Sequence, residues 1–183
     1  MNRKSLPNRK SIRLKDYDYT QEATFFITLV CQNRVKRFGK IVNGEMILNN
    51  IGEIAVREWI KTAHVRPNVS LGEFVIMPDH VHMILHIDQR SELLKDQTEH
   101  PEGKLYCPSQ SLGAIIRGYK GAVTKQIREI LDPGVEYRIK EKIWQRDYYE
   151  RIIRSQHEYD AYTRYILENP RKGGLHPPDD RQA

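Results

Sequence analysis

The chain has 183 residues, of which 39% are hydrophobic and 30% charged, and its formal net charge is +6. This length allows one domain with a buried core, and a basic balance favours polyanionic partners, mainly through phosphate contacts. No apolar stretch approaches the ~20 residues of a membrane span, and no apolar run follows the basic N-terminus as it would in a signal peptide. Two cysteines are too few for a disulfide framework, so we expect a cytoplasmic protein with reduced thiols.

The first half of the chain predicts a basic arm, a strand, a hairpin and a helix. Residues 1–22 form the arm, which is either a tail or a segment that contacts phosphates. Residues 23–32 are rich in β-branched and aromatic side chains, as strands are. Residues 40–48 predict a small hairpin that turns at an Asn-Gly pair, which is typical of type I′ turns. Apolar side chains then recur at helical spacing from about residue 50 to residue 64.

Two more strands and a second helix are predicted next. Residues 70–77 and 81–87 form one long strand, or two strands broken at Pro78. The polar segment 88–110 is predicted to be a loop or an insertion. A helix capped by its first residue follows over residues 111–131. Its apolar face consists of Leu112, Ile115, Ile116, Tyr119, Val123, Ile127 and Ile130.

The last part of the chain predicts a short strand within residues 142–154 and a final helix. This helix begins at Ser155, and Glu158 three residues further on completes a capping box. It is predicted to end at Asn169, because the proline that follows disfavours helix in the residue before it.

The order of these elements predicts an α+β fold, in which helices pack on an antiparallel sheet. No internal repeat divides the chain. We assign residues 23–174 to a single domain and residues 175–183 to a C-terminal tail.

The segment FVIMPDHVHMILHI is the most informative part of the chain. Because side chains alternate across a strand, His80 and His82 point to the same face. The opposite face is apolar and is expected to enter the core through Val81, Met83, Leu85 and Ile87. Two imidazoles on a stiff strand are half of a metal site, although many such pairs are ordinary surface residues. His86 lies ~13 Å beyond His82 at strand rise, so we expect it to be structural.

A divalent ion held by two imidazoles needs a third ligand, with positions left for substrate oxygens. Asn169, Asp79 and Glu168 are the candidates. We discount Asp79, because in a regular strand it would project from the face opposite the two histidines.

The last helix carries Tyr165 and Asn169 four residues apart, so both lie on one face. One helix can therefore deliver a nucleophile and a metal ligand together. The alternative is an ordinary tyrosine at a helix edge, beside a core stripe formed by Tyr159, Tyr162 and Ile166. Tyr119 is the other tyrosine to compare, and its place on an apolar helix face favours a core role.

Together these residues resemble a known family. MPDHVHMIL is similar to the HUH motif (histidine, hydrophobic residue, histidine) of single-tyrosine transposases. IWQRDYYERIIR and YILENPRKGG are similar to segments of the REP-associated tyrosine transposases, which show Tyr-x-x-x-Asn-Pro there. The resemblance covers residues 23–174, with the motifs in the expected order. Related insertion-sequence transposases have Gln at the position of Asn169.

The resemblance implies a ferredoxin-like antiparallel sheet, with the histidines on a central strand and the tyrosine on a helix laid against it. It implies His80, His82 and Asn169 as ligands of Mg²⁺ or Mn²⁺, and Tyr165 as the nucleophile. The implied activity is cleavage and rejoining of single-stranded DNA at hairpins through a 5′-phosphotyrosine, by a monomer or a homodimer.

Basic side chains are expected to follow the DNA backbone, and aromatic side chains to stack on unpaired bases. The basic candidates are Arg34, Lys36, Arg37, Arg117, Lys120, Arg146 and Arg151. Two other functions stay open, namely a DNA-binding protein that no longer cuts and a metal-dependent hydrolase that uses water in place of tyrosine.

Overall fold

The computed structural model describes residues 21–88, 111–131 and 142–173. Its main sheet has four strands in the order β4-β5-β1-β6, and all neighbouring strands are antiparallel. These strands are β1 (Ala23–Val30), β4 (Val69–Ile76), β5 (His80–Ile87) and β6 (Tyr149–Ile153). Helix α1 (Asn50–His64) connects β1 to β4, and α2 (Leu112–Leu131) lies between β5 and β6. This order confirms the expected ferredoxin-like arrangement.

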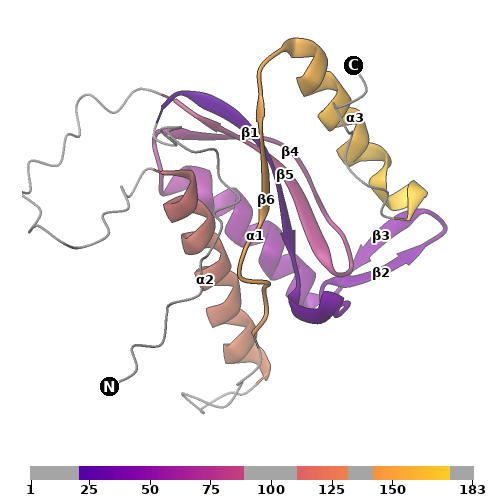
Figure 1. Ribbon diagram of the computed structural model, residues 1–183. Coiled ribbons are helices and arrows are strands. Elements are labelled where there is room, and N and C mark those ends of the chain that lie inside the picture. The colour runs from indigo at the N-terminus through magenta and orange to yellow at the C-terminus, as the bar shows by residue number, and fades with distance from the viewer. Residues whose placement is uncertain (1–20, 89–110, 132–141, 174–183) are drawn as a thin grey trace, which may run out of the picture.

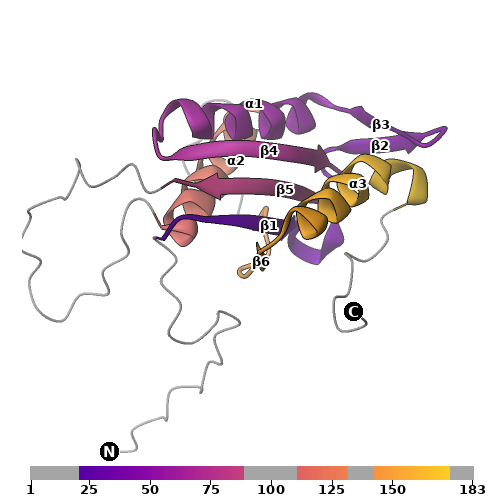
Figure 2. The same ribbon diagram turned by 90° about the horizontal axis from the view of Figure 1, so that it is seen from above.

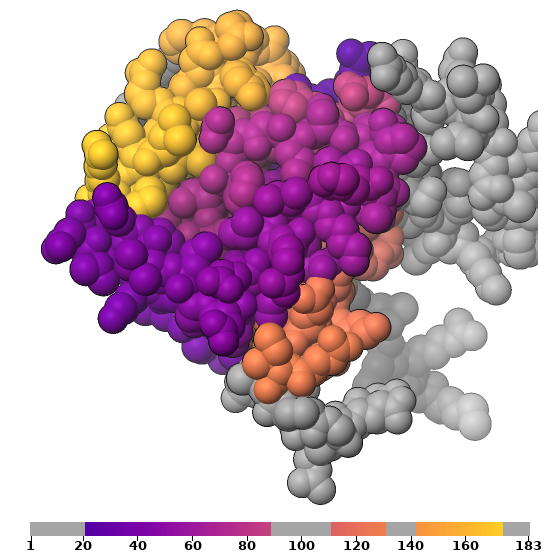
Figure 3. Space-filling view, turned by 180° about the vertical axis from the view of Figure 1, so that it is seen from behind, coloured from indigo at the N-terminus to yellow at the C-terminus, as the bar shows by residue number. Residues whose placement is uncertain are grey.

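The helices lie on both faces of the sheet. Helices α1 and α2 cover one face, and the additional helix α3 (Gln156–Lys172) lies against the other (Figure 1). Figure 2 shows α1 and α3 on different sides of the strands when the molecule is seen from above. In the view from behind, α3 and α2 lie at opposite edges of the surface formed by α1 and the hairpin (Figure 3).

The predicted hairpin is confirmed. Its strands are β2 (Gly39–Val42) and β3 (Glu45–Leu48), which pair with each other and not with the main sheet. The two turn residues, Asn43 and Gly44, have φ angles of 52° and 79°. Two consecutive positive φ angles are what a type I′ turn requires, and asparagine and glycine adopt them at low cost.

The larger core lies between the sheet and helices α1 and α2. The apolar face predicted for β5 is confirmed, because Val81, Met83, Leu85 and Ile87 are all buried there. The predicted apolar face of α2 is buried as well, except for Ile130, which is exposed. A separate, smaller core beneath α3 consists of Phe26, Ile84, Ile153, Tyr162 and Ile166.

The boundaries of α1 match the prediction, and the end of α3 does not. The side chain of Asn49 caps α1 by accepting a hydrogen bond from the Gly52 amide. At the start of α3 the Ser155 hydroxyl accepts a hydrogen bond from the Glu158 amide, as predicted. The prediction that α3 ends at Asn169 is wrong. The helix contains Pro170 and continues to Lys172, and Gly173 closes it in a left-handed conformation.

Several predictions fall on residues that the structure leaves undescribed. These are the basic arm up to residue 20, the loop from residue 89 onward, the tail and Cys107. Within the described ranges, no helix is long and apolar enough to cross a membrane.

Substitution of Gly52 tests the close packing at the start of α1, and substitution of a glycine in α2 is the control. Gly52→Ala is expected to lower the free energy of unfolding by ~1–3 kcal/mol, because the new Cβ would lie 2.2 Å from the Phe38 carbonyl oxygen. Gly121→Ala in α2 is the matched control, since its Cβ would meet no atom within 4 Å. It should raise the free energy of unfolding by ~0.5–1 kcal/mol. Urea unfolding measures both changes, and a Gly52→Ala protein as stable as the control would contradict this packing.

Candidate active site

The site lies on the face of the sheet that α3 covers. In the pairing of β1 with β5, Thr28 stands directly opposite His82. The Thr28 hydroxyl and Nδ1 of His82 form a hydrogen bond of 2.8 Å. The rings of His80 and His82 lie side by side, with centroids 4.7 Å apart. The structure thus brings the two predicted histidines together on a central strand.

Asp79 supports His80, contrary to the expectation that it would point to the opposite face. Strand β5 begins only at His80, so Asp79 belongs to the bend before the strand and does not follow strand alternation. Its Oδ1 lies 2.5 Å from Nδ1 of His80, and its Oδ2 lies 3.5 Å from Nη1 of Arg34. The carboxylate therefore contacts the outer side of the imidazole, while Arg34 neutralises part of its charge.

Tyr165 extends from α3 toward the histidines. Its hydroxyl oxygen lies 3.0 Å from Nε2 of His82. Phe26 supports this contact, because its ring stacks on both His82 and Tyr162 and meets Tyr165 edge-on. The nucleophile predicted from the sequence and one of the predicted metal ligands are therefore hydrogen-bonded across the interface of sheet and helix.

Asn169 lies one helical turn after Tyr165 and is almost completely buried, with 1% of its surface exposed. Within the described part of the chain, neither its Oδ1 nor its Nδ2 has a hydrogen-bond partner of good geometry. The Asn169 side chain nevertheless acts on Tyr165 as a hydrogen-bonding group, because it lowers the pKa of that tyrosine.

Burial dominates the electrostatics of the site. It lowers the pKa of His82 well below the usual range, and the neighbouring His80 lowers it further. Burial raises the pKa of Tyr165, and the Asn169 side chain opposes part of this rise. At neutral pH the His82 imidazole is therefore neutral, as a metal ligand must be, and the Tyr165 hydroxyl keeps its proton.

The residues present fit a divalent metal ion. Each histidine has Nδ1 engaged by a protein oxygen, so Nε2 is the nitrogen that would bind an ion. At His82 such an ion would replace the present contact of Nε2 with the Tyr165 hydroxyl. Outer partners of this kind orient the imidazoles of metal sites. The described residues contain no cluster of three His, Cys, Asp or Glu side chains suited to a metal. Asn169 as the third ligand stays a prediction.

The seven basic residues predicted to bind DNA are spread over the molecule. Arg34 lies beside the site through Asp79, and Arg151 stands opposite Phe26 on the same face of the sheet. Lys36 and Arg146 are exposed in segments that precede β2 and β6. Their role in DNA binding stays a prediction.

The three other basic candidates are placed differently. Arg37 is partly buried, and Arg117 extends from α2, on the far side of the sheet from the histidines. Lys120, also on α2, donates hydrogen bonds to three backbone carbonyls, those of residues 145, 146 and 147. Burial lowers its pKa to about 8, and Asp147 opposes this shift. The Lys120 ammonium group therefore stabilises the segment that leads into β6.

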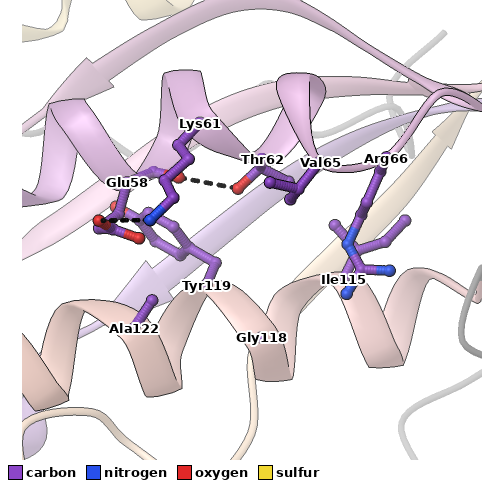
Figure 4. Close-up of a pocket in the computed structure, with 9 residues that line it drawn as sticks. All are labelled: Glu58, Lys61, Thr62, Val65, Arg66, Ile115, Gly118, Tyr119 and Ala122. Atoms are coloured by element: carbon purple, nitrogen blue, oxygen red, sulfur yellow. Dashed lines mark hydrogen bonds and ion pairs between the residues drawn. The ribbon is translucent and has the colours of Figure 1, made fainter.

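A cavity of about 210 Å³ lies between α1 and α2, away from the histidines (Figure 4). Its polar groups are engaged with one another. Lys61 and Glu58 form an ion pair at 3.9 Å, and Thr62 donates to the Glu58 carbonyl. Tyr119 donates its hydroxyl to the Ala55 carbonyl and has its pKa raised by burial, so it is a core residue rather than a nucleophile.

Sequence reasoning missed Thr28 and Phe26, which hold His82 in place. Strand alternation puts both on one face of β1 and so marks them as a pair. What the sequence does not show is which residues of β5 stand opposite them, because 54 positions separate Thr28 from His82.

Comparisons with known proteins agree with the fold described above. No protein-family model matches the chain. Over 172 residues it is 37% identical to an uncharacterized protein of Haemophilus influenzae, and the match covers 89% of this chain and 88% of that protein. The solved structure of a REP-associated tyrosine transposase bound to a REP hairpin covers 90% of this chain and 75% of its own, with a TM-score of 0.56 and 22% identity. The chain therefore has the fold of that transposase.

The buried histidines predict a loss of stability in acid. Burial lowers the pKa of His82 and His86, so the unfolded chain binds more protons than the folded chain once the pH falls toward 6.5 and below. The stability that these neutral imidazoles contribute is present above the unfolded pKa and is lost as the pH falls. We expect the urea midpoint to drop between about pH 7.5 and about pH 5.

His86→Gln should make this drop smaller. His64→Gln, a change of an exposed histidine on α1, is the control and should leave the drop as it is. Equal drops in wild type and His86→Gln would show that His86 does not contribute.

Proposed function

We propose that this chain, which belongs to the same protein family as the Haemophilus influenzae protein, is a metal-dependent tyrosine transposase. It would cleave and rejoin single-stranded DNA at hairpins. The observation that carries the proposal is the position of the Tyr165 hydroxyl, 3.0 Å from Nε2 of His82 and one helical turn from the buried amide of Asn169. The transposase fold of the chain supports it.

The chemistry is a transesterification. The Tyr165 oxygen forms a bond to the scissile phosphorus, and the bond from phosphorus to the 3′ oxygen breaks. The tyrosine loses its proton and the departing 3′ oxygen gains one, so the products are a 5′-phosphotyrosine and a free 3′-OH. The new ester keeps the energy of the phosphodiester, so attack by another 3′-OH rejoins the strand without ATP.

Burial of Tyr165 disfavours the loss of its proton, which the attack on the phosphorus requires. Because its pKa is raised, the hydroxyl is neutral before the reaction and must lose its proton as it attacks. His80, His82 and Asn169 would hold Mg²⁺ or Mn²⁺ at this place. Such an ion supplies a Lewis acid that polarises the scissile phosphate. Thr28 and Asp79 would keep the two imidazoles oriented.

Binding of the DNA would use the face of the sheet that carries the histidines. Arg34 and Arg151 border the site and match the negative charge of a phosphate backbone. Tyr149 on β6 is exposed and meets Phe26 edge-on, so it offers a ring on which an unpaired base can stack.

Replacing Tyr165 tests the proposal directly. The protein is incubated with Mn²⁺ and single-stranded hairpin oligonucleotides taken from the DNA that flanks its own gene, and the products are separated on a denaturing gel. Wild type should give a covalent protein–DNA band, and Tyr165→Phe should give none. Tyr162→Phe is the matched control, because Tyr162 is a buried core residue whose ring stacks on Phe26, and it should keep the adduct.

Other outcomes distinguish the alternatives. Cleavage without an adduct, unaffected by Tyr165→Phe, would establish a hydrolase that uses water. Binding of the hairpins with neither cleavage nor adduct would favour a DNA-binding protein that does not cut.

The outer partner of His82 gives a second test. Thr28→Val keeps the shape of the side chain and removes the hydrogen bond to Nδ1 of His82, so the affinity for Mn²⁺ should fall by about 10- to 100-fold. Thr24→Val removes the same bond from His86 and should leave this affinity unchanged. Titration followed by electron paramagnetic resonance of free Mn²⁺ measures both. An equal effect of the two variants would contradict the assignment of His82 as a ligand.

A further inference from the structure

The face of the sheet beneath α3 contains a second arrangement that repeats the first. Thr24 stands opposite His86 in the pairing of β1 with β5, just as Thr28 stands opposite His82. The distance from the Thr24 hydroxyl to Nδ1 of His86 is 2.8 Å, the same as at the first site. Helix α3 again supplies a tyrosine, because the ring of Tyr159 lies against that of His86 with centroids 5.7 Å apart.

The two arrangements differ in how the tyrosine approaches. Tyr165 meets His82 edge-on, at 71°, with its hydroxyl on Nε2. The rings of Tyr159 and His86 are tilted by 30° to each other, so this tyrosine does not meet its histidine edge-on. His86 and Tyr159 are both partly exposed, whereas His82 is buried. His86 and Tyr159 therefore present ring surface to the solvent, whereas Tyr165 directs its hydroxyl at a histidine nitrogen.

The surroundings of this pair determine the kind of ligand that it suits. Burial lowers the pKa of His86, and Asp88 opposes the shift only in part, so the imidazole is neutral at pH 7. Among the described residues, the charged side chain that acts on it is the carboxylate of Asp88, which would repel a phosphate. Gly72 on β4 leaves room for the Tyr159 hydroxyl, since a Cβ there would lie 3.1 Å from it. Two rings with the hydroxyls of Tyr159 and Thr24 beside them, and with no cation among the described residues known to act on His86, suit an unpaired nucleobase.

We propose that His86 and Tyr159, held by Thr24, form a subsite for an unpaired base of the single-stranded DNA. This inference rests on the proposed function, because it concerns the same strand of DNA. His86 lies four residues beyond His82 on β5, or ~13 Å, and Tyr159 lies six residues before Tyr165 on α3, or ~9 Å. At ~3.4 Å per stacked nucleotide, the bound base lies about three or four nucleotides from the scissile phosphate.

Equilibrium binding tests the subsite without any need for cleavage. Tyr165→Phe protein is titrated with fluorescein-labelled single-stranded hairpin oligonucleotides from the flanking DNA, and fluorescence anisotropy is measured at several salt concentrations. Adding Tyr159→Leu or His86→Ala should weaken binding by about fivefold or more. The slope of affinity against salt should stay the same, because no phosphate contact is lost. Arg151→Ala should reduce that slope.

Abasic nucleotides locate the base. A single abasic substitution within about five nucleotides of the hairpin stem should weaken binding to the Tyr165→Phe protein, and the same substitution should have little further effect once Tyr159→Leu is present. Tyr159→Phe should keep most of the affinity, because it keeps the ring. His64→Ala, which changes an exposed histidine on α1, is the control and should bind as the parent does.

The outcomes separate the two proposals. Affinity unchanged within twofold in both Tyr159→Leu and His86→Ala, or a reduced salt slope, would overturn the subsite. Equal sensitivity to abasic sites with and without Tyr159→Leu would also overturn it. Urea unfolding of the same variants excludes a loss of fold as the cause of weaker binding. Failure of wild type to form an adduct would overturn the tyrosine chemistry alone, since the binding experiment lacks the Tyr165 hydroxyl.

Discussion

The pairing of β1 with β5 is the interaction on which the rest of the structure depends. It sets Thr28 against His82 and Phe26 against Ile84, and it does so with the apolar residues of β5 turned toward α1 and α2. Because the side-chain period of a strand is two, a slip of one residue would exchange the two faces. The histidines would then point into the larger core, and Val81 and Met83 would face α3. One register therefore fixes the core and the site at the same time.

The two faces of the sheet differ in how firmly they are covered. The face beneath α1 and α2 buries most of the large apolar side chains, including Trp59 and Phe25. The face beneath α3 buries only a small cluster around Phe26, Tyr162 and Ile166. Because hydrophobic stabilisation grows with buried apolar area, α3 is held by less free energy than the other two helices. Tyr165 thus stands on the helix that can shift at the smallest cost, while His80 and His82 stand on a strand fixed from both sides.

The sequence predicted the local features of this fold well, because they depend on neighbouring residues. Helix α1, the hairpin turn at Asn43 and the alternation along β5 follow from spacing and turn chemistry. Two features were not predictable in this way. The hydrogen bond between Thr28 and His82 and the bonds from Lys120 to the segment before β6 join parts of the chain that are far apart in sequence.

The end of α3 shows how tertiary packing overrides a local rule. A proline disfavours helix in the residue before it, yet Asn169 is helical and buried. Two contacts offset the cost. Ile166, one turn earlier, is packed in the smaller core, and the amide of Gly173 donates to the Asn169 carbonyl. The helix therefore continues past Asn169, which keeps this residue on the same helix as Tyr165, one turn further along.

Stability alone does not explain the polar residues at this site. A buried amide whose hydrogen bonds are incomplete costs up to about 3 kcal/mol, and an apolar side chain of similar size at position 169 would avoid that cost. The same reasoning applies to His82, which is buried and neutral although a strand facing a small aromatic core would be more stable with an apolar residue. A ligand that binds these groups only in the folded state raises the free energy of unfolding and so offsets part of this cost. Packing and stability therefore do not account for a buried amide at position 169 or a buried imidazole at position 82, and the aromatic stack around Phe26 provides the packing that lets the fold tolerate them.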